Sequence, residues 1–240
     1  MSDDAERPLD GHLTPLIRTV ALGARLIAGS ITRVRVEGAI DEIPSDGPVI
    51  LAANHISNGD AVILGAWLTK RLGRRIHWLG KKEMFDWPIV GWMARNGGVH
   101  PVDRGGADVD AFRTAERVLN EGHVLMIFPE GTRSPTGELQ KPKDGLAMLA
   151  LRTGAPIVPI GIADTDRVWP KGRLLPRPGG HATMRVGRPF RLSHELAAGL
   201  DRKSAKTAAT DLIMRRIAAE LPPRHRGAYA VGAETQSLAD

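Results

Sequence analysis

Short apolar runs along the chain alternate with stretches of helical spacing. Seven short segments are strand candidates, because they are rich in Val, Ile and Leu and in places alternate between apolar and polar residues with a period of two. They are residues 32–36, 48–53, 75–79, 99–102, 124–128, 156–162 and 183–186. Helical spacing predicts helices at about residues 59–72, 87–95, 108–121 and 144–153. This order of elements predicts an α/β fold, with a mixed, mostly parallel central sheet of about seven strands flanked by helices.

Residues 1–31 predict an acidic tip followed by an amphipathic helix. Thr14 can cap this helix, with Pro15 at its first position, and its polar line carries Arg18 and Arg25. Apolar side chains cover most of its other sides: Leu16, Ile17, Val20, Ala24, Ile27 and Ile31 on one stripe, Leu22 and Leu26 beyond it. Such a helix either packs against the domain or lies flat in a lipid interface with its arginines reaching headgroups.

The chain length allows one globular domain with a sizeable core. Of the 240 residues, 42% are apolar and 25% charged, and we place the domain at residues 32–221. Residues 222–240, which begin Pro-Pro and continue with small and polar residues, are predicted to be a mobile tail. No apolar run approaches the roughly 18 residues of a membrane span, and the start is acidic, so we expect a cytoplasmic protein.

The basic residues are unevenly distributed along the chain. Residues 167–194 hold seven Arg or Lys and no Asp or Glu, and a second cluster comprises Lys70, Arg71, Arg74 and Arg75. Each cluster suits an anionic partner, either a membrane surface, a phosphorylated substrate or a nucleic acid, or else is a solvated face. With one Tyr, four Phe and no recognised nucleic-acid motif, nucleic acid is the least favoured partner.

The stretch NHISNGD, residues 54–60, interrupts two apolar runs. His55 and Asp60 would lie about 140° apart on a regular helix, so they can meet only across a turn. Ser57, Asn58 and Gly59 supply helix-start residues for that turn. The carboxylate could then fix one ring nitrogen of the histidine and leave the other as a base. Alternatively, Asp60 simply favours the helix start, and His55 is a hydrogen-bonded bystander.

Further polar stretches follow other strand candidates. FPEGTRS (128–134) combines a glycine with Glu130 and Arg133, while GKKE (80–83) and VDR (102–104) place basic residues after strands. Arginine can grip a phosphate with two hydrogen bonds, and strand ends are where open α/β sheets bind ligands. The chain has no cysteine and no GxSxG stretch, and Ser57 is better read as a cap than as a nucleophile. The histidines are too scattered to predict a metal site.

The order NHISNGD, GKKE, GGVHPVDRG, FPEGTRS and APIVPIGI resembles the glycerolipid acyltransferase family, over about residues 36–190. The resemblance implies that His55 is the catalytic base and Asp60 its orienting carboxylate. It implies that a phosphorylated acceptor is held by Arg104, Glu130, Gly131, Thr132 and Arg133, with Lys81 or Lys82 as a further contact, and that Pro159 shapes an acyl channel. The chain departs from the family at residues 142–145, where PKDG lacks the usual aromatic residue.

The resemblance leads to two hypotheses, and the charge of the chain leads to a third. The first is transfer of an acyl group from acyl-CoA or acyl-carrier protein, used as co-substrate without a cofactor, to lysophosphatidic acid (1-acylglycerol-3-phosphate), which gives phosphatidic acid. The enzyme would be peripheral on the cytoplasmic face of the cell membrane, with residues 167–191, including Trp169, Leu174 and Leu175, against an anionic membrane surface. The second is transfer to another lipid or glycolipid hydroxyl. The third is a non-enzymatic basic binding module.

Overall fold

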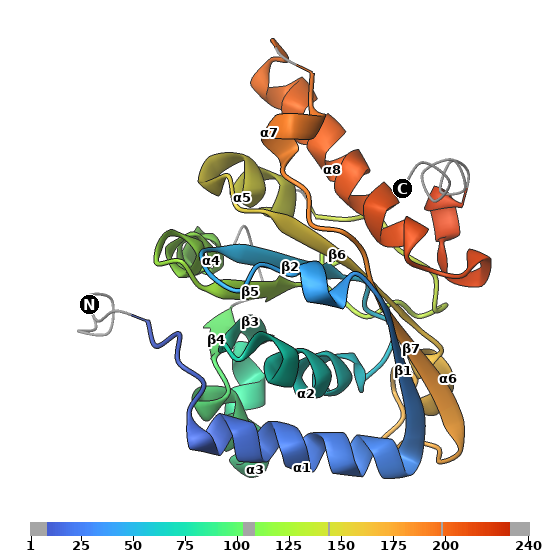
Figure 1. The fold of residues 1–240 in the computed structure, drawn as a ribbon. Helices are drawn as coiled ribbons and strands as arrows, with labels where there is room; N and C mark the ends of the chain where they lie inside the picture. The colour runs from blue at the N-terminus through green and yellow to red at the C-terminus, as the bar shows by residue number, and fades with distance from the viewer. Residues whose placement is uncertain (1–8, 103–108, 144, 198, 231–240) are drawn as a thin grey trace.

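The computed structural model describes residues 9–102, 109–143, 145–197 and 199–230, and its centre is a seven-stranded sheet (Figure 1). The strands are β1 (Thr32–Gly38), β2 (Val49–Ala53), β3 (Ile76–Lys81), β4 (Val99–Val102), β5 (Val124–Ile127), β6 (Ile157–Ala163) and β7 (Gly180–Val186). Their order is β1-β7-β6-β2-β5-β3-β4. Neighbours are parallel except β6 and β7, which confirms the mixed, mostly parallel sheet.

Helices cover both faces of the sheet, so its central strands are apolar throughout. The helices are α1 (Pro15–Ile31), α2 (Asp60–Leu72), α3 (Pro88–Asn96), α4 (Val109–Asn120), α5 (Gly145–Thr153), α6 (Thr165–Val168), α7 (Leu192–Glu195) and α8 (Arg202–Ala219). In Figure 1, α2 and α1 lie below the sheet and α4, α5 and α8 lie above it. Residues of β2 point alternately to the two sides, Ile50 and Ala52 toward α5 and α8, and Leu51 toward α2.

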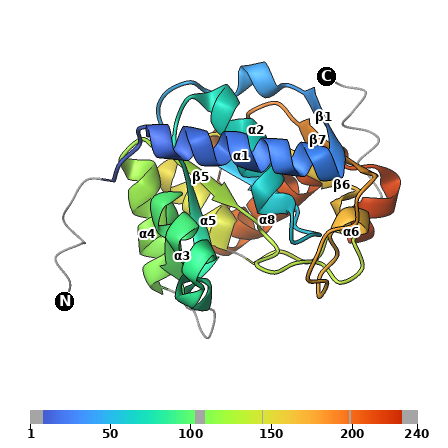
Figure 2. The same ribbon diagram turned by 90° about the horizontal axis from the view of Figure 1, so that it is seen from below.

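Helix α1 begins as predicted, because the Thr14 hydroxyl accepts the Ile17 N–H and Pro15 is the first helical residue. It lies across α2, seen from below in Figure 2. The Arg25 guanidinium stacks on the Trp67 ring at 5.1 Å, so this arginine faces the domain. On the other side Leu22, Leu26 and Ile27 are about two-thirds exposed. No helix in the described part of the chain is long and apolar enough to cross a membrane.

The C-terminal part differs in two ways from what the sequence led us to expect. Helix α8 was not predicted, although Asp201 caps it and Ala209, Ile213 and Ile217 form its buried stripe. Residues 222–230 are not a loose tail, because Pro223–His225 and Gly227–Tyr229 form 3-10 turns packed on the domain, with His225 fully buried. Buried polar contacts, rather than apolar spacing, hold this segment. The acidic tip at residues 1–8 and residues 231–240 lie outside the described residues.

Candidate active site

The site begins at the loop that joins β2 to α2. Asn54, fully buried, donates its side-chain amide to the Ile162 carbonyl at 2.9 Å and accepts the Ile162 N–H at 2.7 Å. These two bonds continue the pairing of β2 with β6 beyond the last paired residues. The sheet therefore fixes where the polar loop starts.

His55 and Asp60 meet across the turn, as their spacing predicts. The His55 Nδ1 lies 2.8 Å from Asp60 Oδ2, and the Asp60 side chain is fully buried at the start of α2. Oδ2 also accepts the N–H groups of Ile56 and Ser57, each at 2.7 Å. Hydrogen bonds to a carboxylate favour its charged form. The charged carboxylate selects the tautomer with a proton on Nδ1 and leaves Nε2 unprotonated.

The His55 ring is oriented by packing as well as by Asp60. It stacks on the Phe128 ring with 4.0 Å between centroids and 15° between planes. The ring lines a pocket of about 670 Å³ whose walls are mostly apolar. An unprotonated imidazole nitrogen beside an apolar pocket is suited to accept a proton from a bound hydroxyl.

Glu130 was expected to hold the acceptor, but the structure gives it another task. It is buried, and its Oε1 and Oε2 accept the N–H groups of His55 at 2.6 Å and Gln140 at 3.0 Å. Burial raises the pKa of the Glu130 carboxyl to about 7 against the effect of these two bonds. The Ser134 N–H also donates to the His55 carbonyl at 2.7 Å. The FPEGTRS stretch thus grips the backbone of His55 on both sides.

The other residues of FPEGTRS differ in their surroundings. Gly131 has φ +68° and lines the pocket, and a Cβ there would lie 2.9 Å from the Lys143 side chain. Thr132 is exposed. Arg133 is half-buried, and its carbonyl accepts a hydrogen bond from Lys171 Nζ. Lys143 lines the pocket together with His55 but was not among the predicted site residues. Its position in the PKDG stretch, shortly after FPEGTRS, could have indicated it.

The remaining candidates do not converge on His55. Lys81 and Lys82 are exposed, Lys81 pairs with Glu83 at 2.8 Å, and neither lysine lines the pocket. Arg104 lies outside the described residues. Pro159 is buried within β6, where it pairs with Ala52 of β2. In the part of the chain that the structure describes, it lines neither of the two pockets.

Ser57 is a structural residue in the described loop. It is fully buried, its hydroxyl donates to the Trp169 carbonyl at 2.8 Å, and the same oxygen accepts the Gly59 N–H at 3.0 Å. A hydroxyl held in this way is not an exposed nucleophile, although the residue that caps α2 is Gly59 and not Ser57, which the sequence had favoured.

A second, smaller pocket of about 340 Å³ reaches the same loop from the α1 side. Its walls are almost entirely apolar and come from α1, α2, α3 and residues 165–176. Its lining also includes Ser57, Gly59 and Thr165, which adjoin Asp60 in sequence or by contact. The His55–Asp60 pair is thus approached by apolar pockets from both faces of the sheet.

Three further histidines, His77, His100 and His123, lie together near the amino ends of β3, β4 and β5. His77 and His100 are hydrogen-bonded at 3.0 Å, and the His77 ring stacks on both His100 and His123 with 5.2 Å between centroids. No group of three or more His, Asp or Glu side chains within the described ranges is arranged to hold a metal ion.

Comparison with known proteins identifies the family of the chain. A sequence profile of the acyltransferase family matches residues 33–163, which include His55, Asp60 and the FPEGTRS stretch. The chain belongs to this family.

Particular relatives share parts of the chain. A chloroplastic 1-acyl-sn-glycerol-3-phosphate acyltransferase of Arabidopsis thaliana is 32% identical over 58% of this chain and 38% of its own length. A lyso-ornithine lipid O-acyltransferase of Pseudomonas aeruginosa is 34% identical over 66% of this chain and 58% of its own. The matches thus span only part of these curated relatives. The crystal structure of a Thermotoga maritima 1-acyl-sn-glycerophosphate acyltransferase superposes with a TM-score of 0.68 at 26% identity, covering 84% of this chain and 78% of that one.

Proposed function

We propose that this protein transfers a fatty acyl group from a thioester to the free hydroxyl of 1-acylglycerol-3-phosphate and so forms phosphatidic acid. The observation that carries the proposal is the 2.8 Å contact between His55 Nδ1 and Asp60 Oδ2, with the ring on the wall of a large apolar pocket. The names of the Arabidopsis and Thermotoga relatives support this acceptor. Acyl-CoA or acyl-carrier protein is the proposed co-substrate.

The proposed chemistry is a direct transfer. Nε2 of His55 accepts the hydroxyl proton while the acceptor oxygen attacks the thioester carbonyl carbon. The C–S bond then breaks, the new ester bond forms, and the leaving sulfur takes the proton back from His55. Asp60 stays ionised and stabilises the imidazolium that forms between the two steps.

Lysine and arginine side chains near His55 are proposed to bind the acceptor's phosphate. Lys143 lines the pocket beside His55, and Arg133 lies in the FPEGTRS stretch that holds the His55 backbone. A phosphate between them would gain charge-assisted hydrogen bonds. Arg104 stays a predicted contact, since it lies outside the described residues.

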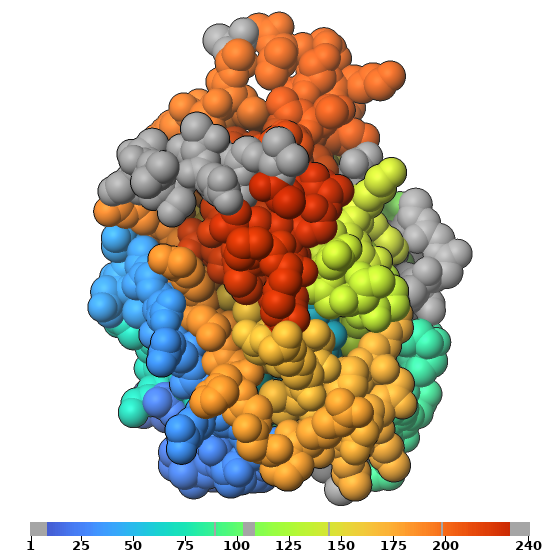
Figure 3. Space-filling view, turned by 90° about the vertical axis from the view of Figure 1, so that its right-hand side faces the viewer, coloured from blue at the N-terminus to red at the C-terminus, as the bar shows by residue number. Residues whose placement is uncertain are grey.

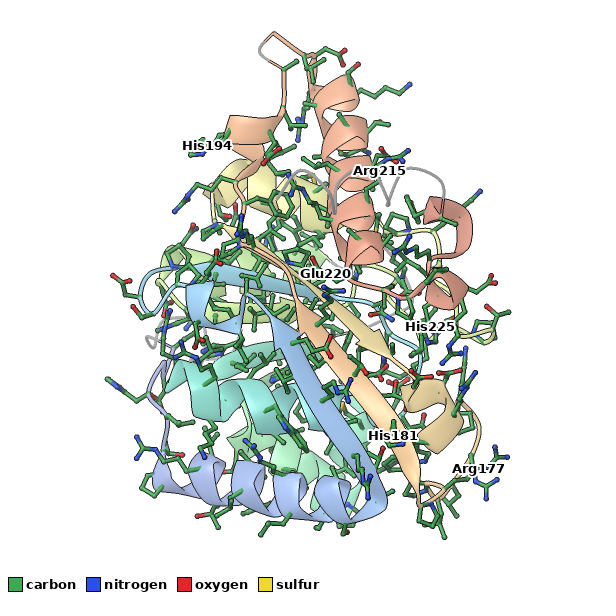
Figure 4. The ribbon with its side chains drawn as sticks, turned by 45° about the vertical axis from the view of Figure 1, so that its right-hand side comes forward. Arg177, His181, His194, Arg215, Glu220 and His225 are labelled. Carbon is green, nitrogen blue, oxygen red and sulfur yellow. The ribbon has the colours of Figure 1, made fainter. Side chains whose placement is uncertain are left out.

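The protein is further proposed to bind a membrane through its apolar rim, which we define as the exposed side chains of Leu22, Leu26, Ile27, Trp92, Met93, Leu174 and Leu175. Residues of α1, α3 and the 169–176 stretch all line the smaller pocket, so the rim surrounds its mouth. Arg173 and Arg177 are exposed in the same stretch, and Figure 4 shows Arg177 pointing away from the domain near the level of α1. Anionic lipid would add about 1 kcal/mol for each such arginine. We place this contact on the cytoplasmic face.

An acyl-transfer assay tests the activity. Purified protein is given lysophosphatidic acid with acyl-CoA or acyl-carrier-protein thioesters, and thiol release is followed, with the product identified by mass. We expect phosphatidic acid, and its absence with every donor contradicts the proposal. Lyso-ornithine lipid is the second acceptor to include, because the Pseudomonas relative acts on it by name. Its exclusive use would replace the proposed acceptor but keep the proposed reaction.

Vesicle sedimentation tests the membrane contact separately. Leu22→Ser and Leu26→Ser, combined in one variant, should weaken binding to phosphatidylglycerol vesicles. The matched control is Leu151→Ser, because Leu151 is an exposed leucine of α5 on the other face of the sheet. Equal binding by both variants would remove the rim from the proposal.

A further inference from the structure

The carboxylate of Asp60 has a partner that lies far away in the sequence. Thr165 is the first residue of α6, is buried, and donates its hydroxyl to Asp60 Oδ1 at 2.6 Å. The other oxygen, Oδ2, receives His55 and two backbone N–H groups. The threonine hydroxyl therefore sets the plane of the carboxylate that orients the histidine.

We propose that Thr165 is a positioning residue of the His55–Asp60 pair and that residues 222–230, here called the C-terminal brace, hold it in place. This inference rests on the proposed function, because it assigns the machinery that keeps the base ready to act. A carboxylate with one oxygen unpaired can rotate about its Cβ–Cγ bond. The hydroxyl removes that freedom and keeps Oδ2 directed at the imidazole.

The backbone before Thr165 requires such support. Asp164 has φ +66°, and among the described residues it is the one non-glycine residue in the left-handed region. This conformation is unfavourable for a side chain-bearing residue unless its surroundings hold it. Its N–H donates to His225 Nε2 at 3.2 Å, and its carboxylate pairs with Arg224. Both partners belong to the C-terminal brace.

The brace also holds the segment that follows FPEGTRS. Nδ1 of His225 donates to the Gly137 carbonyl, and the His225 carbonyl accepts the Leu139 N–H at 2.8 Å. Figure 4 shows His225 beyond the end of β6, and in Figure 3 the red C-terminal segment lies between the yellow-green and amber segments. One neutral imidazole thus ties together the two loops that contact Asp60 and His55.

The first test compares Thr165→Val with Thr165→Ser in the thiol-release assay. Valine keeps the volume but removes the hydroxyl, so kcat should fall about tenfold to a hundredfold while KM for both substrates stays within about twofold. Serine should restore kcat, because it keeps the hydroxyl that donates to Asp60. The matched control is Thr153→Val, because the Thr153 hydroxyl bonds to the backbone in and just after α5, at Leu149 and Ala155.

A second readout does not need turnover. In the NMR spectrum, the proton between His55 Nδ1 and Asp60 should give a downfield resonance in the wild type and in Thr165→Ser, and a shifted or broadened one in Thr165→Val. An unchanged resonance and unchanged kcat in a folded valine variant would overturn the proposal. If the wild type were inactive with every lysolipid, the resonance would still test the positioning and only the proposed function would fail.

The brace is tested through His225. Glutamine can accept from the Asp164 N–H and donate to the Gly137 carbonyl as the imidazole does, whereas leucine can do neither. We expect His225→Leu to lower kcat about tenfold and His225→Gln to keep most of it, with circular dichroism confirming that both variants fold. Equal activity of the folded leucine variant and the wild type would remove the brace from the proposal.

Discussion

His55 follows the carboxyl end of the central strand β2, whereas the stacked His77, His100 and His123 lie near the amino ends of β3, β4 and β5 and have different neighbours. His55 has a buried carboxylate at 2.8 Å and an apolar pocket beside its ring. His77, near the start of β3, has another imidazole at 3.0 Å. Burial, followed by the charges of His100, His123 and Arg75, lowers the pKa of His77 to about 3. His55 has a carboxylate at hydrogen-bond distance and a pocket beside its ring, which suits an imidazole to accept a proton, whereas the partner of the His77 ring nitrogen is another imidazole.

The largest expected effect is the loss of activity on replacing His55, compared with replacing His77 of the histidine stack. His55→Ala should reduce kcat by roughly 10²- to 10⁴-fold with little change in acceptor KM, because a positioned base acts mainly in the transition state. His77→Leu should leave kcat within about twofold. Steady-state kinetics of both variants make the comparison. Similar losses in the two would mean that the loss at His55 reflects folding and not base catalysis.

The second prediction concerns acid stability and belongs to His77. Since its pKa in the folded protein is about 3 and that of the unfolded chain about 6.5, the unfolded chain binds more protons between these values. Wild-type stability should therefore fall as pH drops from 6.5 toward 3, by at most about 5 kcal/mol. Urea unfolding across this range should show a shallower fall for His77→Leu. A slope identical to that of the wild type would contradict this account.

The third prediction concerns Glu130, next to His55, and here the stability changes with pH in the opposite direction. The pKa of Glu130 is raised from 4.5 to about 7, so the folded protein binds the extra proton and loses stability as pH rises between these values, by about 3 kcal/mol. Glu130→Gln should lack this loss, which urea unfolding at pH 5 and pH 8 can measure. The variant should also lose activity at both values, since it retains only one of two acceptors for the His55 and Gln140 N–H groups.

The smallest expected effect concerns Lys143, which lines the pocket beside His55. Lys143→Ala should raise the KM for lysophosphatidic acid about tenfold, the typical loss of one charge-assisted contact, and leave the thioester KM unchanged. Lys81→Ala is the matched control, because Lys81 is exposed and already paired with Glu83. Should the two variants behave alike, Lys143 would not contact the phosphate.

The sequence predicted the sheet and the contact between His55 and Asp60, because both rest on local signals. Apolar runs placed every strand to within a few residues, and five-residue spacing brought His55 and Asp60 together. Contacts between residues far apart in the sequence could not be predicted in this way. Thr165 lies 105 residues from Asp60, and Glu130 lies 75 from His55. No local pattern marks Thr165 as a partner of Asp60, and none marks Glu130 as a partner of the His55 backbone. The acceptor contact of Glu130 stays a prediction.

The C-terminal part shows a second limit of local patterns. Helix α8 carries Arg and Lys among alanines, so its narrow apolar stripe is hard to recognise without knowing that α5 covers it. Residues 222–230 look like a tail because proline and glycine are frequent there. They are nevertheless ordered by the long-range contacts of His225 and Arg224.

The antiparallel pairing of β6 with β7 has a consequence for how a lipid would reach His55. Because β7 and β1 run against the other strands, the end of α1 and the stretch before β7 arrive at the edge where β2 ends, and the Gly179 N–H donates to the Ile31 carbonyl there. A single reversal of strand direction thus brings the end of α1 to the side of the molecule on which the His55 imidazole lies. With the membrane contact proposed above, a lipid would be acylated while its hydrocarbon chain stays in the leaflet.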